Sequence, residues 1–276
     1  MTQRKLVLGV SALGVAGLVM LTSACGLSTV DSYTDDNAIG ETIRSVRLAS
    51  DAGSIKIHTG GPTKVHRTVK HHGDRPGATH RVEGDVLVLT GCEVRDCWID
   101  YDVVVPAGAT ITGQVESGDV TVDDAASVNL RSEAGDVVIR RAGGPVNIAA
   151  ESGAVELTEI GDTVSVEVES GDVKLDRVDG SATVRAQSGK VATIDVGGAT
   201  DIEVTSGDVD VRLTEAADVK ARTESGDVQV IVPRGRYKVT ASTDSGDLEN
   251  AVTADSAGAH SIDLSATSGD VTVRYA

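Results

Sequence analysis

Residues 169–173 read Glu-Ser-Gly-Asp-Val, and close variants of this pentapeptide recur along most of the chain. The central glycine occurs nine times, as Gly118, Gly135, Gly153, Gly171, Gly189, Gly207, Gly226, Gly246 and Gly269. Successive glycines are separated by 17, 18, 18, 18, 18, 19, 20 and 23 residues. So constant a period over nine copies indicates a repeat architecture in which each copy forms one structural unit.

Apolar residues alternate within each repeat, which is typical of short strands with one buried face. In one copy Val173 and Leu175 alternate, Val178 then falls in a turn, and Val184 and Ala186 alternate again. A repeat of about 18 residues is too short for a strand–helix–strand unit. The pattern therefore predicts an all-β parallel β-solenoid, in which each coil of about 18 residues holds two strands and two turns.

The residues before the repeats are less regular but also contain strand-like stretches. These stretches are Val46–Leu48, Ile55–Ile57, Val86–Leu89 and Ile99–Val105. The string Val-Val-Val-Pro-Ala-Gly at 103–108 is echoed by Val-Ile-Val-Pro-Arg-Gly at 230–235. Terminal repeats of a solenoid must be atypical because they cover the end of the stack. We expect residues 43–110 to form an irregular N-terminal cap and residues 111–276 to form the regular coils.

The first 24 residues have the organisation of a secretory signal peptide. Arg4 and Lys5 precede an apolar run from Leu6 to Leu21, and small residues precede Cys25. This stretch resembles a bacterial lipobox, in which Cys25 receives a diacylglyceryl group and becomes the new N-terminus. The alternative is an uncleaved membrane anchor in which Cys25 is incidental. With a lipid on Cys25, residues 25–42 would form a polar tether on the outer face of a bacterial plasma membrane.

Two further cysteines, Cys92 and Cys97, enclose a loop of four residues. An even pair of cysteines in an exported protein usually forms a disulfide. A metal site is the alternative, because His71, His72 and His80 lie upstream. Two thiols do not make the usual zinc pattern, and histidines in a polar stretch are usually solvated. We therefore predict a Cys92–Cys97 disulfide.

The composition fits a narrow interior and an acidic surface. The chain has no Phe, one Trp and four Tyr, yet 40% of its residues are hydrophobic, so its core must consist of small aliphatic side chains. The formal charge is −17, and removal of Arg4 and Lys5 with the leader gives −17 − 2 = −19. This charge excludes nucleic acid and direct docking on anionic lipid, both of which need basic patches. It favours a cationic ligand or a cell-wall component as the partner.

The aspartate that follows the repeated glycine should form a column along one corner of the solenoid. Its members are Asp119, Asp136, Asp172, Asp208, Asp227, Asp247 and Asp270, with Ala154 and Lys190 as interruptions. The column has two interpretations: a site for calcium or another cation, or turn chemistry in which Ser and Asp hydrogen-bond the backbone beside Gly. Calcium-binding nonapeptide rolls have a nine-residue period that this chain lacks. Turn chemistry is therefore favoured, and apart from the calcium alternative we expect no cofactor.

Several of these features together resemble one known family. The Gly-Asp-Val repeats, the strand ending in Val105-Pro106, and the Cys92–Cys97 pair before Asp100-Tyr101-Asp102-Val103 are similar to the bacterial "putative adhesin" family, a domain family of unknown function. The resemblance covers roughly residues 43–276. It implies a right-handed solenoid like a β-helix, and it brings no catalytic residues.

The sequence thus predicts a non-catalytic envelope lipoprotein that presents an acidic rod for adhesion, ligand binding or envelope-stress sensing. One alternative is a passive structural spacer without a ligand. Another is a polysaccharide-active β-helix enzyme, which would need unique catalytic residues, whereas the carboxylates here are repeated copies on minimal turns. The sequence also has no Ser-His-Asp order, no His-Glu-x-x-His motif and no phosphate-binding glycine loop. We therefore expect no enzymatic activity.

Overall fold

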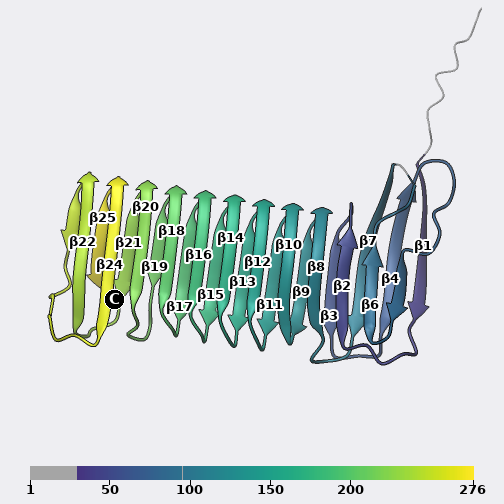
Figure 1. The fold of residues 1–276 in the computed structure, drawn as a ribbon, viewed down its shortest axis with the longest axis horizontal. Coiled ribbons are helices and arrows are strands. Elements are labelled where there is room, and N and C mark those ends of the chain that lie inside the picture. The colour runs from purple at the N-terminus through teal and green to yellow at the C-terminus, as the bar shows by residue number, and fades with distance from the viewer. Residues whose placement is uncertain (1–29, 95) are drawn as a thin grey trace, which may run out of the picture.

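The computed structural model describes residues 30–94 and 96–276, which form an elongated rod of two long β-sheets (Figure 1). The predicted all-β solenoid is confirmed. No helix within these residues is long and apolar enough to cross a membrane. The leader and Cys25 lie outside the described residues, so the lipidation of Cys25 stays a prediction.

The rod has two sheets, which we name sheet I and sheet II. Sheet I contains thirteen strands in the order β1 (Asp31–Ala38), β4 (Lys64–His71), β7 (Cys97–Val105), β3 (Ile55–Thr59), β9 (Val120–Ala125), β11 (Val137–Ala142), β13 (Val155–Ile160), β15 (Val173–Val178), β17 (Val191–Val196), β19 (Val209–Arg212), β21 (Val228–Val232), β25 (Val271–Tyr275) and β23 (Leu248–Asn250). Sheet II contains twelve, in the order β22 (Tyr237–Ser245), β24 (His260–Ser268), β20 (Val219–Ser225), β18 (Thr200–Ser206), β16 (Ala182–Ser188), β14 (Val164–Ser170), β12 (Val146–Ser152), β10 (Ser127–Ala134), β8 (Thr110–Ser117), β2 (Ser45–Ser50), β6 (Val86–Thr90) and β5 (His80–Glu83).

Equivalent residues of successive coils stack on one another through parallel pairing. Val166, for example, pairs with Ile148 on one side and with Val184 on the other, and all three are buried. The prediction that Val178 lies in a turn is wrong, because it is a buried residue at the end of β15. Arg177 has a left-handed φ of 57°, which adds a bulge and turns the next side chain back into the core.

The repeated glycine is required at the corner where each strand of sheet II leads into sheet I. Gly171 has a φ of 153°, a conformation that side chains rarely adopt. A Cβ at this position would also overlap the carbonyl oxygen of Gly153 in the preceding coil. The close stacking of the coils therefore excludes any larger residue at this corner.

Antiparallel strands close the N-terminal end of the rod. β1 pairs with β4, and β4 pairs with β7, while β5 pairs with β6 at the same end of sheet II. The prediction that residues 25–42 form only a tether is therefore wrong for residues 31–38, which are strand β1. Although this strand is polar, it is held in place because Asp35 accepts hydrogen bonds of 2.7 and 2.8 Å from the buried Arg67.

The stacking order departs from the chain order at both ends of the rod. The coil formed by β2 and β3 lies between the coil of β6 and β7 and that of β8 and β9. At the other end, β24 and β25 are inserted between the coil of β20 and β21 and the coil of β22 and β23 (Figure 1). The outermost C-terminal coil is thus not the last in sequence.

Candidate functional sites

The aspartate column is built into the corner turns. At six steps along the column, the carboxylate of one aspartate accepts a hydrogen bond of 2.8–3.0 Å from the backbone amide at the equivalent position of the neighbouring coil. The steps run from Asp119 to the amide of Asp136, Asp136 to Ala154, Asp172 to Lys190, Asp208 to Asp227, Asp227 to Asp270, and Asp270 to Asp247. The turn interpretation predicts such hydrogen bonds between aspartate side chains and backbone amides.

The column does not assemble into a cluster with the form of a metal centre. Among residues 30–94 and 96–276, no group of three or more His, Cys, Asp or Glu side chains could hold a metal ion. Lys190 interrupts the column, and its ammonium pairs with Asp210 on the adjoining strand. That ion pair raises the pKa of Lys190, with smaller contributions from Asp208 and Asp172.

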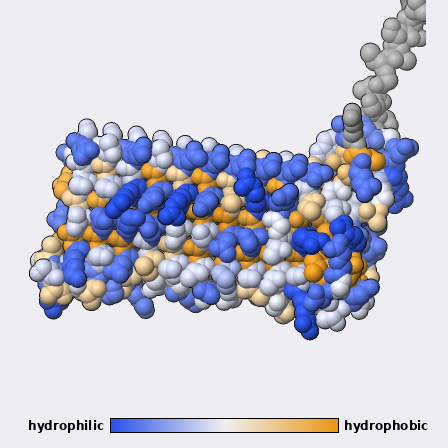
Figure 2. Space-filling model, in the orientation of Figure 1, coloured by the Kyte–Doolittle hydropathy of each residue, from blue (hydrophilic) through white to orange (hydrophobic). Residues whose placement is uncertain are grey.

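A groove of about 690 Å³ runs along the outer face of sheet II, from β10 to β24. Figure 2 views this face and shows hydrophobic surface between rows of hydrophilic side chains. Its floor is a row of small side chains at the third position before each repeated glycine, Ala150, Val168, Ala186, Val204 and Thr223. These inward-facing residues are 3–5% exposed at the base of the groove.

One wall of the groove carries alternating charges. It is formed by the fourth residue before each repeated glycine, which includes Arg131, Glu167, Arg185, Glu203 and Arg222. Arg185 lies 3.6 Å from Glu203, and Glu203 also lies 2.9 Å from Lys220. The hydrogen bond from Lys220 lowers the pKa of Glu203. Most charges on this wall are therefore compensated within the protein.

The other wall carries acidic and uncharged polar side chains. It is formed by the second residue before each repeated glycine, which includes Glu151, Glu169, Gln187, Thr205 and Glu224. Glu151 pairs with Arg131 across the floor. Within the part of the chain that the structure describes, Glu169 and Glu224 have no cationic partner, and neither does Glu167 on the opposite wall. Three uncompensated carboxylates thus surround an apolar floor.

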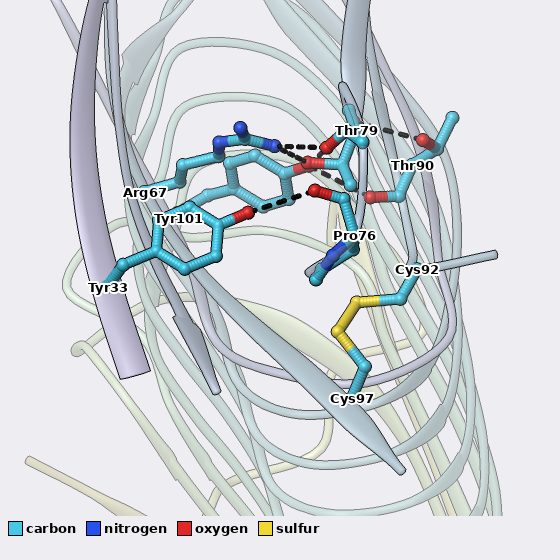
Figure 3. Close-up of a disulfide and its surroundings, with 9 residues drawn as sticks. Tyr33, Arg67, Pro76, Thr79, Thr90, Cys92, Cys97 and Tyr101 are labelled. Atoms are coloured by element: carbon cyan, nitrogen blue, oxygen red, sulfur yellow. Dashed lines mark hydrogen bonds between the residues drawn. A yellow bond between two sulfur atoms is a disulfide. The ribbon is translucent and has the colours of Figure 1, made fainter. Parts of the chain in front are cut away.

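The N-terminal cap contains a second polar cluster, centred on Tyr101 (Figure 3). The Tyr101 hydroxyl lies 2.6 Å from the carbonyl oxygen of Thr79 and 2.9 Å from that of Thr90. Burial raises the pKa of Tyr101 to about 12. Arg67 donates a hydrogen bond of 2.7 Å to the Thr79 hydroxyl and pairs with Asp35, which lowers the pKa of Asp35. These contacts join β1, β4, β6, β7 and the segment that precedes β5.

The predicted cysteine and histidine residues also lie in this cap. Cys92 and Cys97 are joined in a disulfide beside the start of β7 (Figure 3). The structure does not gather His71, His72 and His80 into a common site: His71 packs against Tyr33, and His72 packs against Trp98. His80 is half-buried, and its pKa is lowered by desolvation and then by the nearby Arg67. The cap therefore has the features of a structural closure.

Sequence reasoning found the aspartate column but missed the groove. The signal was present, because its floor and walls occupy fixed positions before every repeated glycine. Alternation alone assigns these positions to the two faces of a strand. It does not reveal that the outward-facing side chains on either side of the buried position enclose a groove.

Two long, mostly parallel sheets built from stacked two-strand coils define a β-solenoid protein. The family model described as "Toastrack DUF4097" matches residues 102–274. The chain therefore belongs to the Toastrack family, and the resemblance to an adhesin-like family of unknown function is confirmed.

Three solved structures share limited similarity with the chain. A "putative adhesin" from Parabacteroides distasonis has 12% identity and a TM-score of 0.43, over 89% of this chain and 98% of that one. A "putative adhesin" from Bacteroides fragilis has 15% identity and a TM-score of 0.40, over 90% and 99%. A "putative cell adhesion protein" from Clostridium sporogenes has 11% identity and a TM-score of 0.32, over 89% and 100%. No curated protein matches the chain.

Proposed function

We propose that the protein is a non-catalytic cell-envelope lipoprotein whose solenoid binds an extended basic peptide segment in the groove of sheet II. The observation that carries this proposal is the set of three uncompensated carboxylates, Glu167, Glu169 and Glu224, around the apolar floor. The net charge of −17 adds a long-range attraction for a cationic ligand. Because the floor side chains are only 3–5% exposed, the aliphatic stems of Lys or Arg would pack mainly against the wall side chains.

The positions of the carboxylates suggest a spacing for the basic residues. Glu169 lies on β14 and Glu224 on β20, three strands further along sheet II. Three strand spacings correspond to about 14 Å, which an extended peptide spans with roughly four residues. Residues four apart lie on the same side of an extended chain, so both basic side chains could face the acidic wall.

The proposed lipid anchor would orient the groove relative to the membrane. Val30, the first described residue, precedes β1 at the capped end of the rod, and Cys25 lies five residues before it. A diacylglyceryl group on Cys25 would therefore hold the capped end at the membrane. The groove would then run along the rod away from the surface.

A fluorescence-anisotropy titration tests the groove. The full chain, purified in mild detergent, is titrated against two labelled peptides whose lysines are either four or three residues apart. We expect tighter binding of the peptide with lysines four apart, because lysines three apart lie on opposite sides of an extended chain. Glu169→Gln with Glu224→Gln should weaken that binding about tenfold, which is the scale of two lost charge contacts.

The matched control removes two other carboxylates that lie outside the groove. Glu215→Gln with Glu249→Gln leaves the groove intact, and within the described residues neither carboxylate has a cationic partner. If both double variants weaken binding equally, the peptide responds only to net charge, and the groove proposal is wrong. Absence of binding to either peptide would instead favour a passive spacer.

The anchor needs a separate test, because the groove could bind a peptide without it. Cells grown with a radioactive fatty acid should label the wild-type chain, and Cys25→Ser should abolish the label. Labelling that survives Cys25→Ser would refute the lipoprotein part of the proposal.

A further inference from the structure

The outermost C-terminal coil leaves most of its inward-facing side chains only partly covered. Val228, Val271 and Leu248 occupy equivalent paired positions in successive strands of sheet I. Val228 and Val271 are 1% and 0% exposed, whereas Leu248 in the last strand is 49% exposed. On the sheet II side, Val239, Ala241 and Thr243 are likewise only partly buried. This end of the rod therefore presents an open layer of the core.

Beyond Tyr237, the backbone of β22 is also unpaired on its outer side. β24 occupies the inner side of the strand along its whole length. On the outer side, only Tyr237 is paired, with Ala254, and its carbonyl oxygen accepts a hydrogen bond of 2.8 Å from the Asp255 amide. No strand of the described chain pairs with the outer edge from Lys238 to Asp244. Such an edge is a template for the addition of another strand.

We infer that this edge pairs with the same edge of a second copy of the chain, in an antiparallel register centred on Ala241. This register places Lys238 opposite Asp244 of the second copy, and Asp244 opposite its Lys238. Both side chains are exposed, and within the described residues neither forms an ion pair. A lysine on an edge strand usually discourages pairing, but a matched aspartate makes this edge complementary to itself.

In the same register, inward-facing side chains of the two copies lie opposite one another. Val239 lies opposite Thr243 of the second copy, and Ala241 lies opposite its equivalent. Residues directly opposite in an antiparallel pair share a face, so these side chains extend the core from one rod into the other. A two-fold axis at Ala241 generates a closed pair with two identical sets of contacts.

The pairing would place the two capped ends at opposite ends of a double-length rod. If Cys25 carries lipid, as the proposed function holds, paired copies would join two facing membrane surfaces. The contact itself depends on neither the lipid nor the groove. Its test can therefore fail while the proposed function stands, and the reverse is also true.

Cysteine cross-linking tests the contact and its register in the full chain. In a Cys25→Ser background, Ala241→Cys should form a covalent dimer under mild oxidation, because opposite residues are about 5 Å apart. Thr240→Cys and Ser242→Cys lie opposite each other in this register, so their mixture should form more covalent dimer than either variant alone. Ser165→Cys, on the outer face of β14, is the control for random collisions.

Charge exchange provides an independent readout that does not require a new thiol. Lys238→Asp should weaken co-purification of two differently tagged copies about tenfold, because two attractive pairs become repulsive. Asp244→Lys should do the same. A mixture of the two variants should restore pairing, because each then supplies the opposite charge to the other.

The outcomes separate the inference from its rivals. Covalent dimers of Ala241→Cys, together with recovery in the mixture, support the centred register. If Ala241→Cys cross-links no faster than Ser165→Cys, or if the mixture of charge variants pairs no better than either alone, the inferred contact is wrong.

Discussion

At the N-terminal end of the rod, antiparallel strands cover the side chains of the outermost coils, whereas at the C-terminal end β22 and β23 leave most of their inward-facing side chains partly exposed. The closed end buries Tyr101 and holds β1 through the Arg67–Asp35 pair. At the other end, a loop covers Tyr237 but leaves Leu248 half exposed. Although β1 and β5 are also edge strands, the apolar interior of the stack is thus covered at one end and partly exposed at the other.

The placement of aromatic residues follows the same division. Tyr33, Trp98 and Tyr101 lie in the cap, and Tyr237 and Tyr275 lie in the last two coils of the stack. The coils between them have cores of small aliphatic side chains. A large ring would not fit between sheets that are stacked coil on coil, but it can fill the irregular space where the stacking ends.

The largest expected difference between the middle and the open end concerns a buried charge. Val166 and Ala241 lie in the same column of stacked positions, linked through Val184, Ile202, Ala221 and Leu264. Val166→Asp should lower the free energy of unfolding by about 4 kcal/mol, because its carboxylate would be buried without a partner. Ala241→Asp should lower it by less than about 1 kcal/mol, because that position is open to solvent. Urea unfolding at low protein concentration measures both, and equal losses would mean that the C-terminal end is not open.

A second comparison sets a corner glycine of the stack against a glycine in a turn. Gly84 has a φ of 67° with open space around it, whereas Gly171 has a φ of 153° and a Cβ there would strike the neighbouring coil. Gly171→Ala should destabilise the rod by about 3 kcal/mol, and Gly84→Ala by about 1 kcal/mol, the scale of the left-handed conformation alone. Similar losses in urea unfolding would indicate that stacking does not restrict the corner glycine.

Removal of the disulfide should affect the cap more than the middle of the rod. Cys92→Ser with Cys97→Ser should lower the stability of the cap by about 2 kcal/mol, as expected for so short a loop. Fluorescence of Trp98, the single tryptophan, should report this loss, while circular dichroism of the β-rich rod should change little. Complete alkylation of both cysteines in the denatured, unreduced wild-type chain would show that the disulfide is not formed.

The smallest expected effect is a pH dependence confined to the cap. Because the pKa of His80 is lowered in the folded state, the unfolded chain binds a proton more readily as the pH falls below about 6.5. Cap stability should therefore decrease between about pH 7 and pH 5, by at most about 1.4 kcal/mol per pH unit for one group. The transition followed by Trp98 fluorescence should shift with pH, and His80→Gln should remove most of that shift. An unchanged shift in His80→Gln would assign it to other groups.

The regular part of the fold could be predicted because its two constraints are local. The corner glycine and the alternating valines recur at fixed spacing, so the coil, its two strands and the aspartate turns follow from the sequence. The order of the end coils could not be predicted in the same way. β24 and β25 have the same apolar pattern as any other coil, and nothing in that pattern specifies which coil they lie beside.

The polar edge strand β1 was missed for a related reason. Its sequence, Asp-Ser-Tyr-Thr-Asp-Asp-Asn-Ala, has little apolar alternation, and its pairing depends on Arg67 and other residues distant in the chain. The groove was missed because it arises from the shape of many adjacent strands. Both features depend on contacts between residues that are far apart in the sequence. The pattern of apolar and polar residues reflects only residues that are close together in the sequence.

Hydrogen exchange followed by mass spectrometry tests most directly whether the rod has one closed end and one open end. Backbone amides of β24 and β25, within residues 260–275, lie between two other coils and should exchange slowly. Amides of β22 and β23, within residues 237–250, lie at the open end and should exchange faster, although they come earlier in the chain. Measured at low concentration, this inverted order is the predicted result. Protection that instead falls steadily toward the C-terminus, with residues 260–275 the fastest, would contradict the account.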